Sequence, residues 1–286
     1  MILVTGASGK LGRAVVRELA ARVAPAGVVA GSRTPREAAE HGDVQTRFVD
    51  FDVPASLEAS LQGVETVLVI PTAAHEARRR LQHRAAIEAY ASVPVVAYAS
   101  LLGADRHGDN ALLETHALAE ADLRRRQQPS IVFRNGVYLE SLPMLLAGGL
   151  QGGVIDHPAG DGKVSLILRS EIAAAIATRL TQPATEAYEV IELVGERPHG
   201  FGELARHVAK LLGREIRYAP ASIAAYRASL AAVGMPPHAV DAFVEVCQAI
   251  AAGRLAGSST DAARLLGRTP TGALDYLDSA LTRSSP

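Results

Sequence analysis

Three glycines near the amino end of the chain have a spacing that could hold a phosphate. They lie in residues 6–12, between an apolar run at residues 1–5 and an amphipathic helical pattern that begins at Leu11. A strand, a glycine turn and a helix in this order place bare backbone amides and the positive end of a helix dipole against an anion. Such a turn is often only a turn, but its place directly after an apolar strand favours a dinucleotide site. The residues predicted to contact the dinucleotide here are Gly6, Ser8, Gly9, Lys10, Leu11 and Gly12.

The end of the second expected strand, at residues 28–33, bears on the choice of cofactor. Sites selective for NAD place an Asp or Glu there, which binds the ribose 2′-hydroxyl and repels a 2′-phosphate. This chain has Ser32 and Arg33 instead, a hydroxyl and a guanidinium that can pair with a phosphate. Arg33 is therefore predicted to favour NADPH, with NADH as the alternative cofactor if this arginine is simply solvated at a strand end.

A continuous apolar run at residues 67–71 predicts a parallel strand that is buried on both faces. Ligands of open α/β sheets bind outside the carboxyl ends of the strands. Ile70, Pro71 and Thr72 are accordingly predicted to contact the dinucleotide.

The Gly-x-x-Gly-x-x-Gly spacing resembles that of the short-chain dehydrogenase/reductase superfamily, in its extended and atypical branches. The resemblance implies that Asp50 and Phe51, at an expected third strand over residues 48–52, meet the adenine; alternatively, they are a turn acid and a packed aromatic side chain. It also implies that Ser100, at the end of a strand expected at residues 93–100, is the active-site serine. The helix expected at 110–126 should then carry a Tyr-x-x-x-Lys pair that protonates the substrate.

The tyrosine–lysine pair is absent from this chain. The only lysines are Lys10, Lys163 and Lys210, and the residues four positions before them are Gly6, Ala159 and Arg206. Leu112 and His116 occupy the two places instead. His116 lies on one helical stripe with apolar neighbours, which is typical of a hydrogen-bonded core histidine but also allows a role in the active site.

Further segments carry a narrower resemblance, to the NmrA-like family of atypical short-chain dehydrogenases/reductases. It covers nearly the whole chain and is strongest to the quinone reductases and triphenylmethane reductases of that family. The segments are 98–102, His116-x-x-x-Glu120, Arg134-Asn135-Gly136-x-Tyr138, 188–195, 250–254 and 265–270. The resemblance implies that Asn135 and Gly136 contact the nicotinamide end of the cofactor. It makes Ser100, His116 and Tyr138 the candidate catalytic residues, Tyr138 by stacking on the substrate unless it is plain packing.

These features predict an NAD(P)H-dependent oxidoreductase that transfers hydride to a quinone-like, conjugated acceptor. Quinone reduction yields a delocalised hydroquinone anion, so a strong, prepositioned acid is less necessary than for a ketone. The rival hypothesis is a non-catalytic NAD(P)-binding redox sensor that regulates a protein partner, since it also needs no tyrosine–lysine pair. An epimerase or dehydratase is disfavoured because those reactions need the absent tyrosine. One departure from the quinone reductases is Ala121, where they have a lysine, so any role of that lysine is vacant here.

Composition excludes several other classes. A formal net charge of −1 provides no strong field for nucleic acid or an anionic membrane surface. No apolar run approaches the ~20 residues that span a bilayer, and the strand at Met1 leaves no room for a signal peptide, so we expect a cytoplasmic protein. The single cysteine, Cys247, lies on an apolar helical stripe and excludes an intramolecular disulfide or a cysteine-rich metal site. We expect no metal, and a small-molecule acceptor such as a quinone as the partner.

The elements that must position these residues indicate the fold class. With 286 residues, 48% of them hydrophobic, the chain can form one large α/β domain and a smaller appendage. Alternating strand and helix patterns predict a Rossmann-type doubly wound parallel sheet. We expect an NAD(P)-binding domain at residues 1–150, completed by a returning strand within 164–195, and a mostly helical substrate-capping domain at 196–286. Two long helices on the open sheet could form a homodimer surface. The arginine runs at 78–80 and 124–126 are expected to be solvated helix surface.

Overall fold

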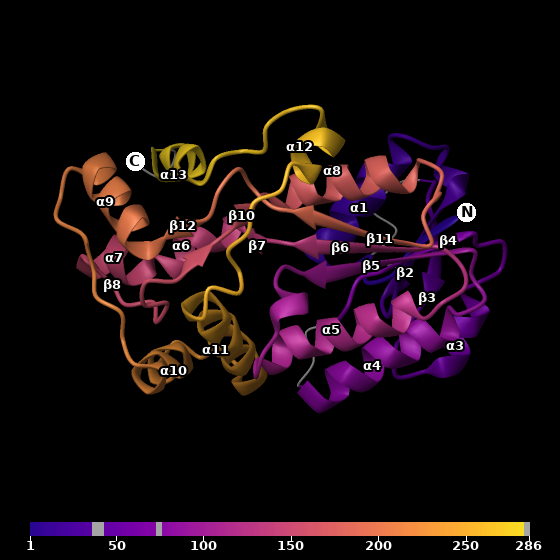
Figure 1. Cartoon of the computed structure of the whole chain (residues 1–286), viewed down its shortest axis with the longest axis horizontal. Coiled ribbons are helices and arrows are strands. Elements are labelled where there is room, and N and C mark those ends of the chain that lie inside the picture. The colour runs from indigo at the N-terminus through magenta and orange to yellow at the C-terminus, as the bar shows by residue number, and fades with distance from the viewer. Residues whose placement is uncertain (36–42, 73–75, 283–286) are drawn as a thin grey trace.

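A seven-stranded parallel sheet forms the centre of the amino-terminal part of the molecule (Figure 1). The computed structural model describes residues 1–35, 43–72 and 76–282. The strand order is β11-β6-β5-β4-β1-β2-β3, so the order along the sheet reverses between β1 and β4. The strands are β1 (Ile2–Val4), β2 (Val28–Ser32), β3 (Gln45–Phe48), β4 (Thr66–Val69), β5 (Val95–Leu101), β6 (Ser130–Asn135) and β11 (Tyr188–Leu193). This doubly wound order confirms the predicted Rossmann-type fold and puts the ligand crevice at the carboxyl ends of β1 and β4.

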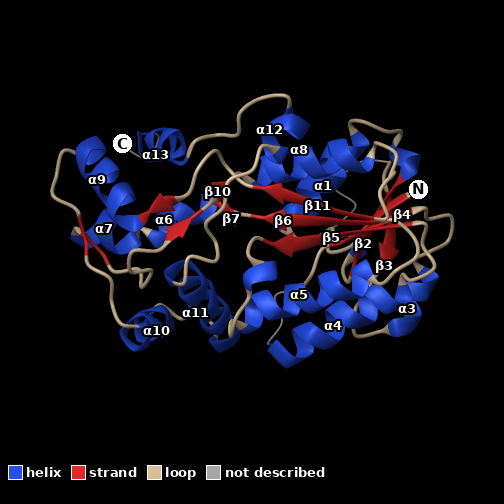
Figure 2. Cartoon of the chain, viewed as in Figure 1, coloured by secondary structure: helices blue, strands red, loops and turns tan. Residues whose placement is uncertain are grey.

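Helices cover both faces of the sheet (Figure 2). One layer consists of α1 (Lys10–Ala20), α8 (Arg169–Leu180) and α12 (Asp261–Leu266), and the other consists of α3 (Pro54–Ala59), α4 (Glu76–Ala89) and α5 (Ala111–Arg124). Each layer packs apolar side chains onto its own face of the sheet, for example Val16 and Ile176 on one side and Leu57 and Leu123 on the other. Both faces of the strands are therefore buried, which explains their continuous apolar runs.

The chain leaves the central sheet at Gly136 and builds a second, smaller part with its own core. Its strands are β7 (Val137–Tyr138), β8 (Val154–Ile155), β9 (Lys163–Val164), β10 (Leu166–Ile167), β12 (His199–Gly200) and β13 (Arg217–Tyr218). Its helices are α6 (Leu142–Leu145), α7 (Ala147–Gly152), α9 (Phe201–Leu212), α10 (Ile223–Ala232), α11 (Pro237–Ala251) and α13 (Ala273–Thr282). Short 3₁₀ turns lie at Pro25–Gly27, Ala104–Arg106 and Leu139–Ser141. Helices α6 and α7 already lie in this second part. Helix α12 packs instead on α8, which covers the central sheet. The predicted domain boundaries at residues 150 and 196 stay predictions.

Two predicted strands differ from those observed. The third strand was expected to begin at Phe48, but β3 ends there. Because β3 is a half-exposed edge strand without an apolar run, the hydrophobic pattern of the sequence does not reveal it. Val49 and Phe51 are buried just after it. Residues 130–138, whose apolar run predicts a sixth strand and its exit, form β6 as far as Asn135 and leave the sheet at Gly136, where a Cβ would lie 2.8 Å from the carbonyl oxygen of Ser165. The glycine thus lets the chain pass close to a neighbouring backbone as it turns into the second part.

Two expectations from composition can be compared with the structure. Cys247 is fully buried, as predicted, and burial raises the pKa of its thiol to about 12. Its sulfur lies 3.3 Å from Nε2 of His157 in the core of the second part. Over the three described ranges, the structure contains no helix with the length and apolar character needed to cross a membrane.

Candidate functional site

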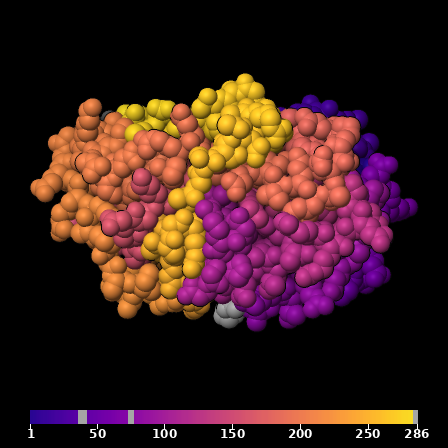
Figure 3. All heavy atoms as spheres, viewed as in Figure 1, coloured from indigo at the N-terminus to yellow at the C-terminus, as the bar shows by residue number. Residues whose placement is uncertain are grey.

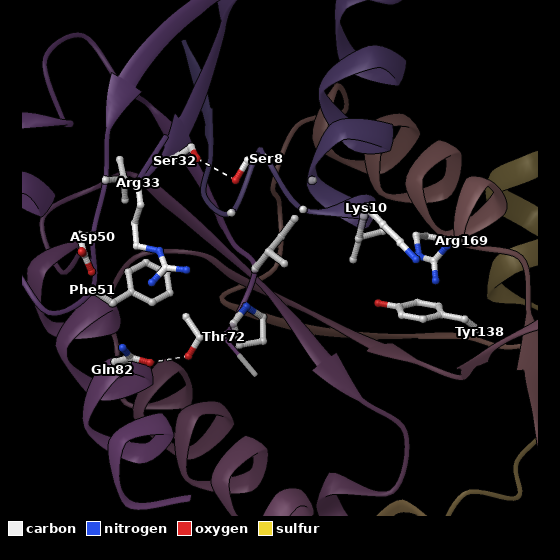
Figure 4. Close-up of a pocket in the computed structure, with 17 residues that line it drawn as sticks. Ser8, Lys10, Ser32, Arg33, Asp50, Phe51, Thr72, Gln82, Tyr138 and Arg169 are labelled. Atoms are coloured by element: carbon white, nitrogen blue, oxygen red, sulfur yellow. Dashed lines mark hydrogen bonds between the residues drawn. The ribbon is translucent and has the colours of Figure 1, made fainter. Parts of the chain in front are cut away.

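A cavity of about 410 Å³ opens at the carboxyl ends of β1, β2 and β4 (Figure 4). It brings together twelve of the residues predicted to bind a dinucleotide. They are Gly6, Ser8, Gly9, Lys10, Leu11, Gly12, Arg33, Asp50, Phe51, Ile70, Pro71 and Thr72. Ser32, which the sequence analysis named beside Arg33, also lines it. The sequence did not single out four further lining residues for this role: Val49, Gln82, Tyr138 and Arg169. We call this space the nucleotide cavity.

The glycine turn gives this cavity a bare backbone wall. Gly6 has a φ of +63°, in the left-handed region that favours glycine. A Cβ on Gly12 would lie 2.2 Å from the carbonyl oxygen of Gly6, so only glycine lets α1 start this close to β1. Gly9 is the N-cap of α1 and provides no side-chain cap, which leaves the first amides of the helix free for a ligand. The turn therefore fits a pyrophosphate group.

One end of the nucleotide cavity carries the residues predicted to select the cofactor. Ser32 is buried, and its hydroxyl donates a 2.8 Å hydrogen bond to the hydroxyl of Ser8. Arg33 is exposed and extends across the cavity toward Asp50 and Phe51 (Figure 4). Its guanidinium is thus placed to meet a phosphate at this end.

The other end of the nucleotide cavity is formed by residues from α8 and β7. The guanidinium of Arg169 lies 4.4 Å from the ring centroid of Tyr138, and the two side chains face the cavity together (Figure 4). Glu140 accepts a hydrogen bond from the backbone N–H of Arg169 and so caps α8. No spacing rule connects Arg169 with the glycine turn, because only the packing of α8 beside α1 brings them together.

A second cavity of about 360 Å³ adjoins the first and shares Leu11, Ile70, Pro71, Thr72 and Tyr138 with it. It contains the remaining predicted site residues, Ser100, His116, Asn135 and Gly136. Apolar side chains line much of it, among them Leu112, where the superfamily has its tyrosine, and Phe243 and Val246 of α11. Figure 3 shows the segment around α11, in yellow-orange, lying directly against the magenta surface of the sheet-bearing part. We call this space the acceptor cavity.

Ser100 is hydrogen-bonded to a buried cluster of charged residues. Its hydroxyl donates a 2.6 Å hydrogen bond to Glu120 of α5. Glu120 also accepts three hydrogen bonds from the guanidinium of Arg134 of β6, the shortest of them 2.7 Å long. Burial lowers the pKa of Arg134, but hydrogen bonding to Glu120 and its charge outweigh this and raise it overall. The cluster joins β5, α5 and β6 behind the acceptor cavity, and it leaves only the lone pairs of Ser100 for a ligand.

His116 is held in a chain of buried hydrogen bonds. Its Nδ1 lies 2.9 Å from the hydroxyl of Tyr98, and Nδ1 of His83 lies 2.9 Å from the same hydroxyl. Burial lowers the pKa of His116 well below its usual range, and the positive charge of Arg79 lowers it further. The imidazole that lines the acceptor cavity is therefore neutral at physiological pH.

Arg79 corrects one expectation from the sequence. Within the run 78–80, taken as solvated helix surface, Arg79 is only 3% exposed and lines the acceptor cavity. Its guanidinium pairs with Glu245 of α11 at 3.2 Å. The rotation of α4 on the sheet turns this one arginine inward, and the pair ties α11 to α4 at the cavity wall.

Comparison with known proteins identifies the family. A family model described as NAD(P)H-binding matches residues 6–183. The chain belongs to this family. Quinone oxidoreductase 2 of Escherichia coli is 33% identical over 95% of each chain. Its crystal structure with NADPH matches with a TM-score of 0.88 over 99% of this chain and 100% of that one. The triphenylmethane reductase of Citrobacter sp., complexed with NADP(H), is 27% identical with a TM-score of 0.88, covering 98% and 100%. These matches confirm the predicted resemblance.

Proposed function

We propose that this protein is an NADPH-dependent oxidoreductase that transfers hydride to a quinone-like, conjugated acceptor. The observation that carries the proposal is the continuity of the two cavities. The nucleotide cavity fits a dinucleotide along its glycine turn, and it shares a wall with an acceptor cavity lined largely by apolar side chains. A flat conjugated molecule bound in the second cavity lies beside the end of a nucleotide bound in the first. The names of the two matched relatives, a quinone reductase and a triphenylmethane reductase, point to the same class of acceptor.

The residues of the nucleotide cavity have distinct tasks in this proposal. When bound, NADPH supplies the hydride. The amides of the glycine turn hold the pyrophosphate, and Arg33 pairs with the 2′-phosphate at the far end. Asn135 and Gly136 lie at the nicotinamide end, where the buried amide oxygen of Asn135 has no hydrogen-bond partner among the described residues and can accept one from the ligand.

The acceptor cavity provides orientation and excludes water. Phe243 and Val246 of α11 cover it from the second part of the chain, while Leu112 closes the position where a tyrosine would stand. Because a reduced quinone carries its negative charge over a conjugated ring, proximity and a dry surface supply most of the catalysis. Tyr138, whose phenol has its pKa raised by burial, stays neutral and stacks beside Arg169 between the two cavities.

This arrangement favours an enzyme over a redox sensor. A sensor needs the nucleotide cavity alone, whereas this chain also has a second, largely apolar cavity beside the predicted nicotinamide end. The homodimer that the sequence allows stays a prediction.

The proposal is tested by mixing the purified protein with NADPH and a panel of benzoquinones and naphthoquinones. We expect loss of absorbance at the reduced-nicotinamide band that depends on both protein and quinone. Tight NADPH binding without turnover of any quinone or other conjugated acceptor would instead support the sensor.

A further inference from the structure

Three buried side chains form an unbranched row behind the acceptor cavity. They are His83 of α4, Tyr98 of β5 and His116 of α5, all less than a tenth exposed. The Tyr98 hydroxyl lies 2.9 Å from Nδ1 of His83 and 2.9 Å from Nδ1 of His116. His116 is the only member of the row that lines the cavity. The row therefore leads from the acceptor cavity into the protein interior.

The geometry at Tyr98 restricts where the hydrogens can be. A phenol has one hydrogen to donate, so it donates to one imidazole and accepts from the other. If it donates to His116, the hydrogen of neutral His116 is on Nε2, and His83 carries its own on Nδ1. If it donates to His83, the hydrogen of His83 is on Nε2 and that of His116 is on Nδ1. The row has two neutral arrangements that differ only in the direction of its hydrogen bonds.

The surroundings keep both imidazoles neutral. Burial, followed by the charge of Arg79, lowers the pKa of His83 to about 4, although a hydrogen bond to the backbone of Thr72 acts in the opposite direction. Burial, followed by His83 and then by the charge of Arg79, lowers the pKa of His116 well below its usual range. Arg79 is the cation that faces the row from α4, and its charge is paired with Glu245 of α11. On the α5 side, the charge of Glu120 acts on Tyr98, and together with burial it raises the pKa of the phenol well above its usual range. Neutral imidazoles joined by a neutral phenol can pass a hydrogen without creating a buried ion.

We propose that His83, Tyr98 and His116 form a proton relay that delivers a proton to the reduced acceptor, with His116 as the donor and the other two as positioning residues. The inference rests on the proposed function, because it supplies the proton donor that the missing tyrosine–lysine pair leaves open. A quinone takes up a hydride and needs one proton on an oxygen to become the hydroquinone.

The proton balance of the relay is complete. His116 gives the hydrogen on Nε2 to the acceptor oxygen and takes one on Nδ1 from Tyr98. Tyr98 takes one from Nδ1 of His83, and His83 takes a proton from water on its Nε2. One proton enters at His83, one leaves at His116, and the row passes from its first arrangement to its second. After product release, a proton from solvent in the open acceptor cavity enters at Nε2 of His116, the hydrogens shift back along the row, and one proton leaves from Nε2 of His83 to water, which restores the first arrangement.

The far end of the row has the feature that this sequence of transfers requires. Nε2 of His83 is buried and has no partner at full hydrogen-bond geometry in the described part of the chain, although the backbone of Thr72 lies close enough to raise the pKa of this imidazole against the effect of burial. An unused ring nitrogen is costly in a core, yet it is the acceptor that the first arrangement needs. Thr72, whose backbone acts on His83, lines both cavities, so the inner end of the row lies near space that is open to solvent.

The experiment compares Tyr98→Phe with Tyr90→Phe. Tyr90 is an equally buried tyrosine of the same core, and its hydroxyl interacts with Ser60 rather than with the row, which makes it the matched control. We expect Tyr98→Phe to lower kcat for a quinone by about 10²-fold at pH 8. KM and NADPH affinity should stay within about twofold of the parent. His83→Gln, which breaks the row at its inner end, should behave in the same way.

Two further readouts separate a relay from a structural role. The loss in Tyr98→Phe should shrink as the pH falls or as imidazole buffer is added at constant pH, because an external acid replaces the relay. Reduction of a cationic triarylmethane dye adds hydride alone and consumes no proton, so where the parent reduces the dye, Tyr98→Phe should reduce it at the parental rate. A folded Tyr98→Phe protein with parental quinone turnover, or with a loss that neither pH nor imidazole changes, would overturn the relay.

Ring-nitrogen NMR of the nucleotide-free protein tests the row without any turnover. At pH 7, the spectra of His83 and His116 should show neutral rings, and Tyr98→Phe should shift both while Tyr90→Phe shifts neither. A charged ring on either histidine would contradict the relay. If the parent reduces no quinone at all, the proposed function fails, whereas the NMR result still reports on the row itself.

Discussion

The nucleotide cavity and the acceptor cavity share a wall at Ile70 and Tyr138 but draw on different parts of the chain. Residues of the nucleotide cavity come mainly from segments that directly follow β1, β2, β3 and β4, so short stretches of sequence carry them. The acceptor cavity takes its lining from α4, β5, α5, α6 and α11, which span more than half of the chain. The first site is therefore a local product of strand ends, and the second depends on how two parts of the molecule pack.

The two cavities also differ in how they present charge. In the nucleotide cavity, Lys10, Arg33 and Arg169 face the space that a dinucleotide fills, and the helix α1 adds its dipole. Around the acceptor cavity, the charged groups are paired with each other, as Arg79 is with Glu245 and Arg134 is with Glu120. One cavity is built to bind an anion, and the other keeps its charges away from a neutral acceptor.

Breaking the ionic cluster behind the acceptor cavity should have the largest effect. Arg134→Met leaves the Glu120 carboxylate buried without its main partner, and we expect the free energy of unfolding to fall by about 3–5 kcal/mol. Chemical denaturation measures this loss. The double variant Arg134→Met/Glu120→Gln should recover part of it. Arg197→Met, which breaks an exposed pair with Glu203, should cost less than about 1 kcal/mol. A fall of more than a few-fold in the NADPH affinity of the folded Arg134→Met protein would show that the ionic cluster also affects the nucleotide cavity. The two cavities would then not be independent of each other.

The complementary change acts on the nucleotide cavity alone. In Gly12→Ala, the new Cβ would meet backbone atoms of Gly6 and Ala7, which cannot rotate away. We expect NADPH affinity to drop by about 10²-fold or more, equivalent to about 2.7 kcal/mol, as measured by fluorescence titration. Gly152→Ala in α7 is the control, because nothing lies within 4 Å of its added Cβ. Parental NADPH affinity in Gly12→Ala would show that the glycine turn does not hold the nucleotide.

The contrast between the cavities also explains what the sequence could predict. The glycine turn, the apolar strands and the residues after them are contiguous, so a spacing rule was enough to select Gly6–Gly12 and Ile70–Thr72 as one group of contacts. Parallel strands bring their carboxyl ends to one edge, and this is where the structure collects them. The fold class was predictable for the same reason, since both faces of the sheet are covered.

The acceptor cavity was less predictable from sequence because part of its wall is a face of α4 that is buried although it carries polar side chains. Arg79, His83 and Ala86 of α4, with Tyr90 directly after the helix, share one side and are buried. Arg79 and His83 are polar, so hydrophobic periodicity does not reveal the face. Their burial is tolerated because Arg79 finds Glu245 and His83 finds Tyr98, contacts across 166 and 15 residues of sequence that no local pattern predicts. The same holds for Phe243, which reaches the cavity only through the packing of α11.

Cofactor selection provides a smaller effect at the outer end of the nucleotide cavity. Arg33→Ala removes an exposed guanidinium, so we expect NADPH affinity to fall by about tenfold while NADH affinity is unchanged. Arg84→Ala, which removes a comparably exposed arginine of α4 outside both cavities, should change neither. Separate titrations with the two nucleotides measure the difference. Equal losses for both nucleotides would assign Arg33 to the shared part of the cofactor rather than to the 2′-phosphate.

The smallest expected effect is a pH dependence that belongs to the acceptor side only. Among the described residues, no histidine lines the nucleotide cavity, whereas His83 and His116 lie at or behind the acceptor cavity with lowered pKa values. Below pH 6.5 the unfolded chain takes up a proton at His83, but the folded protein does not until the pH approaches about 4. The unfolded state is therefore favoured as the pH falls through this window, by up to about 1.4 kcal/mol per pH unit for such a histidine.

Urea denaturation between pH 7 and pH 5 measures this slope. The His83→Gln substitution should reduce the pH slope of the unfolding free energy by the contribution of one histidine. The His238→Gln substitution, at an exposed position of α11, should leave this slope unchanged.

His157 provides a second control for the same measurement. Burial lowers its pKa to about 4 as well, but it lies in the core of the second part, away from both cavities. His157→Gln should therefore flatten the stability slope as much as His83→Gln does and leave the pH profile of quinone reduction alone. If His83→Gln changed neither profile, its imidazole would not be held neutral by the packing of α4, and the difference in charge between the two cavities would reduce to the cations of the nucleotide cavity and the helix dipole.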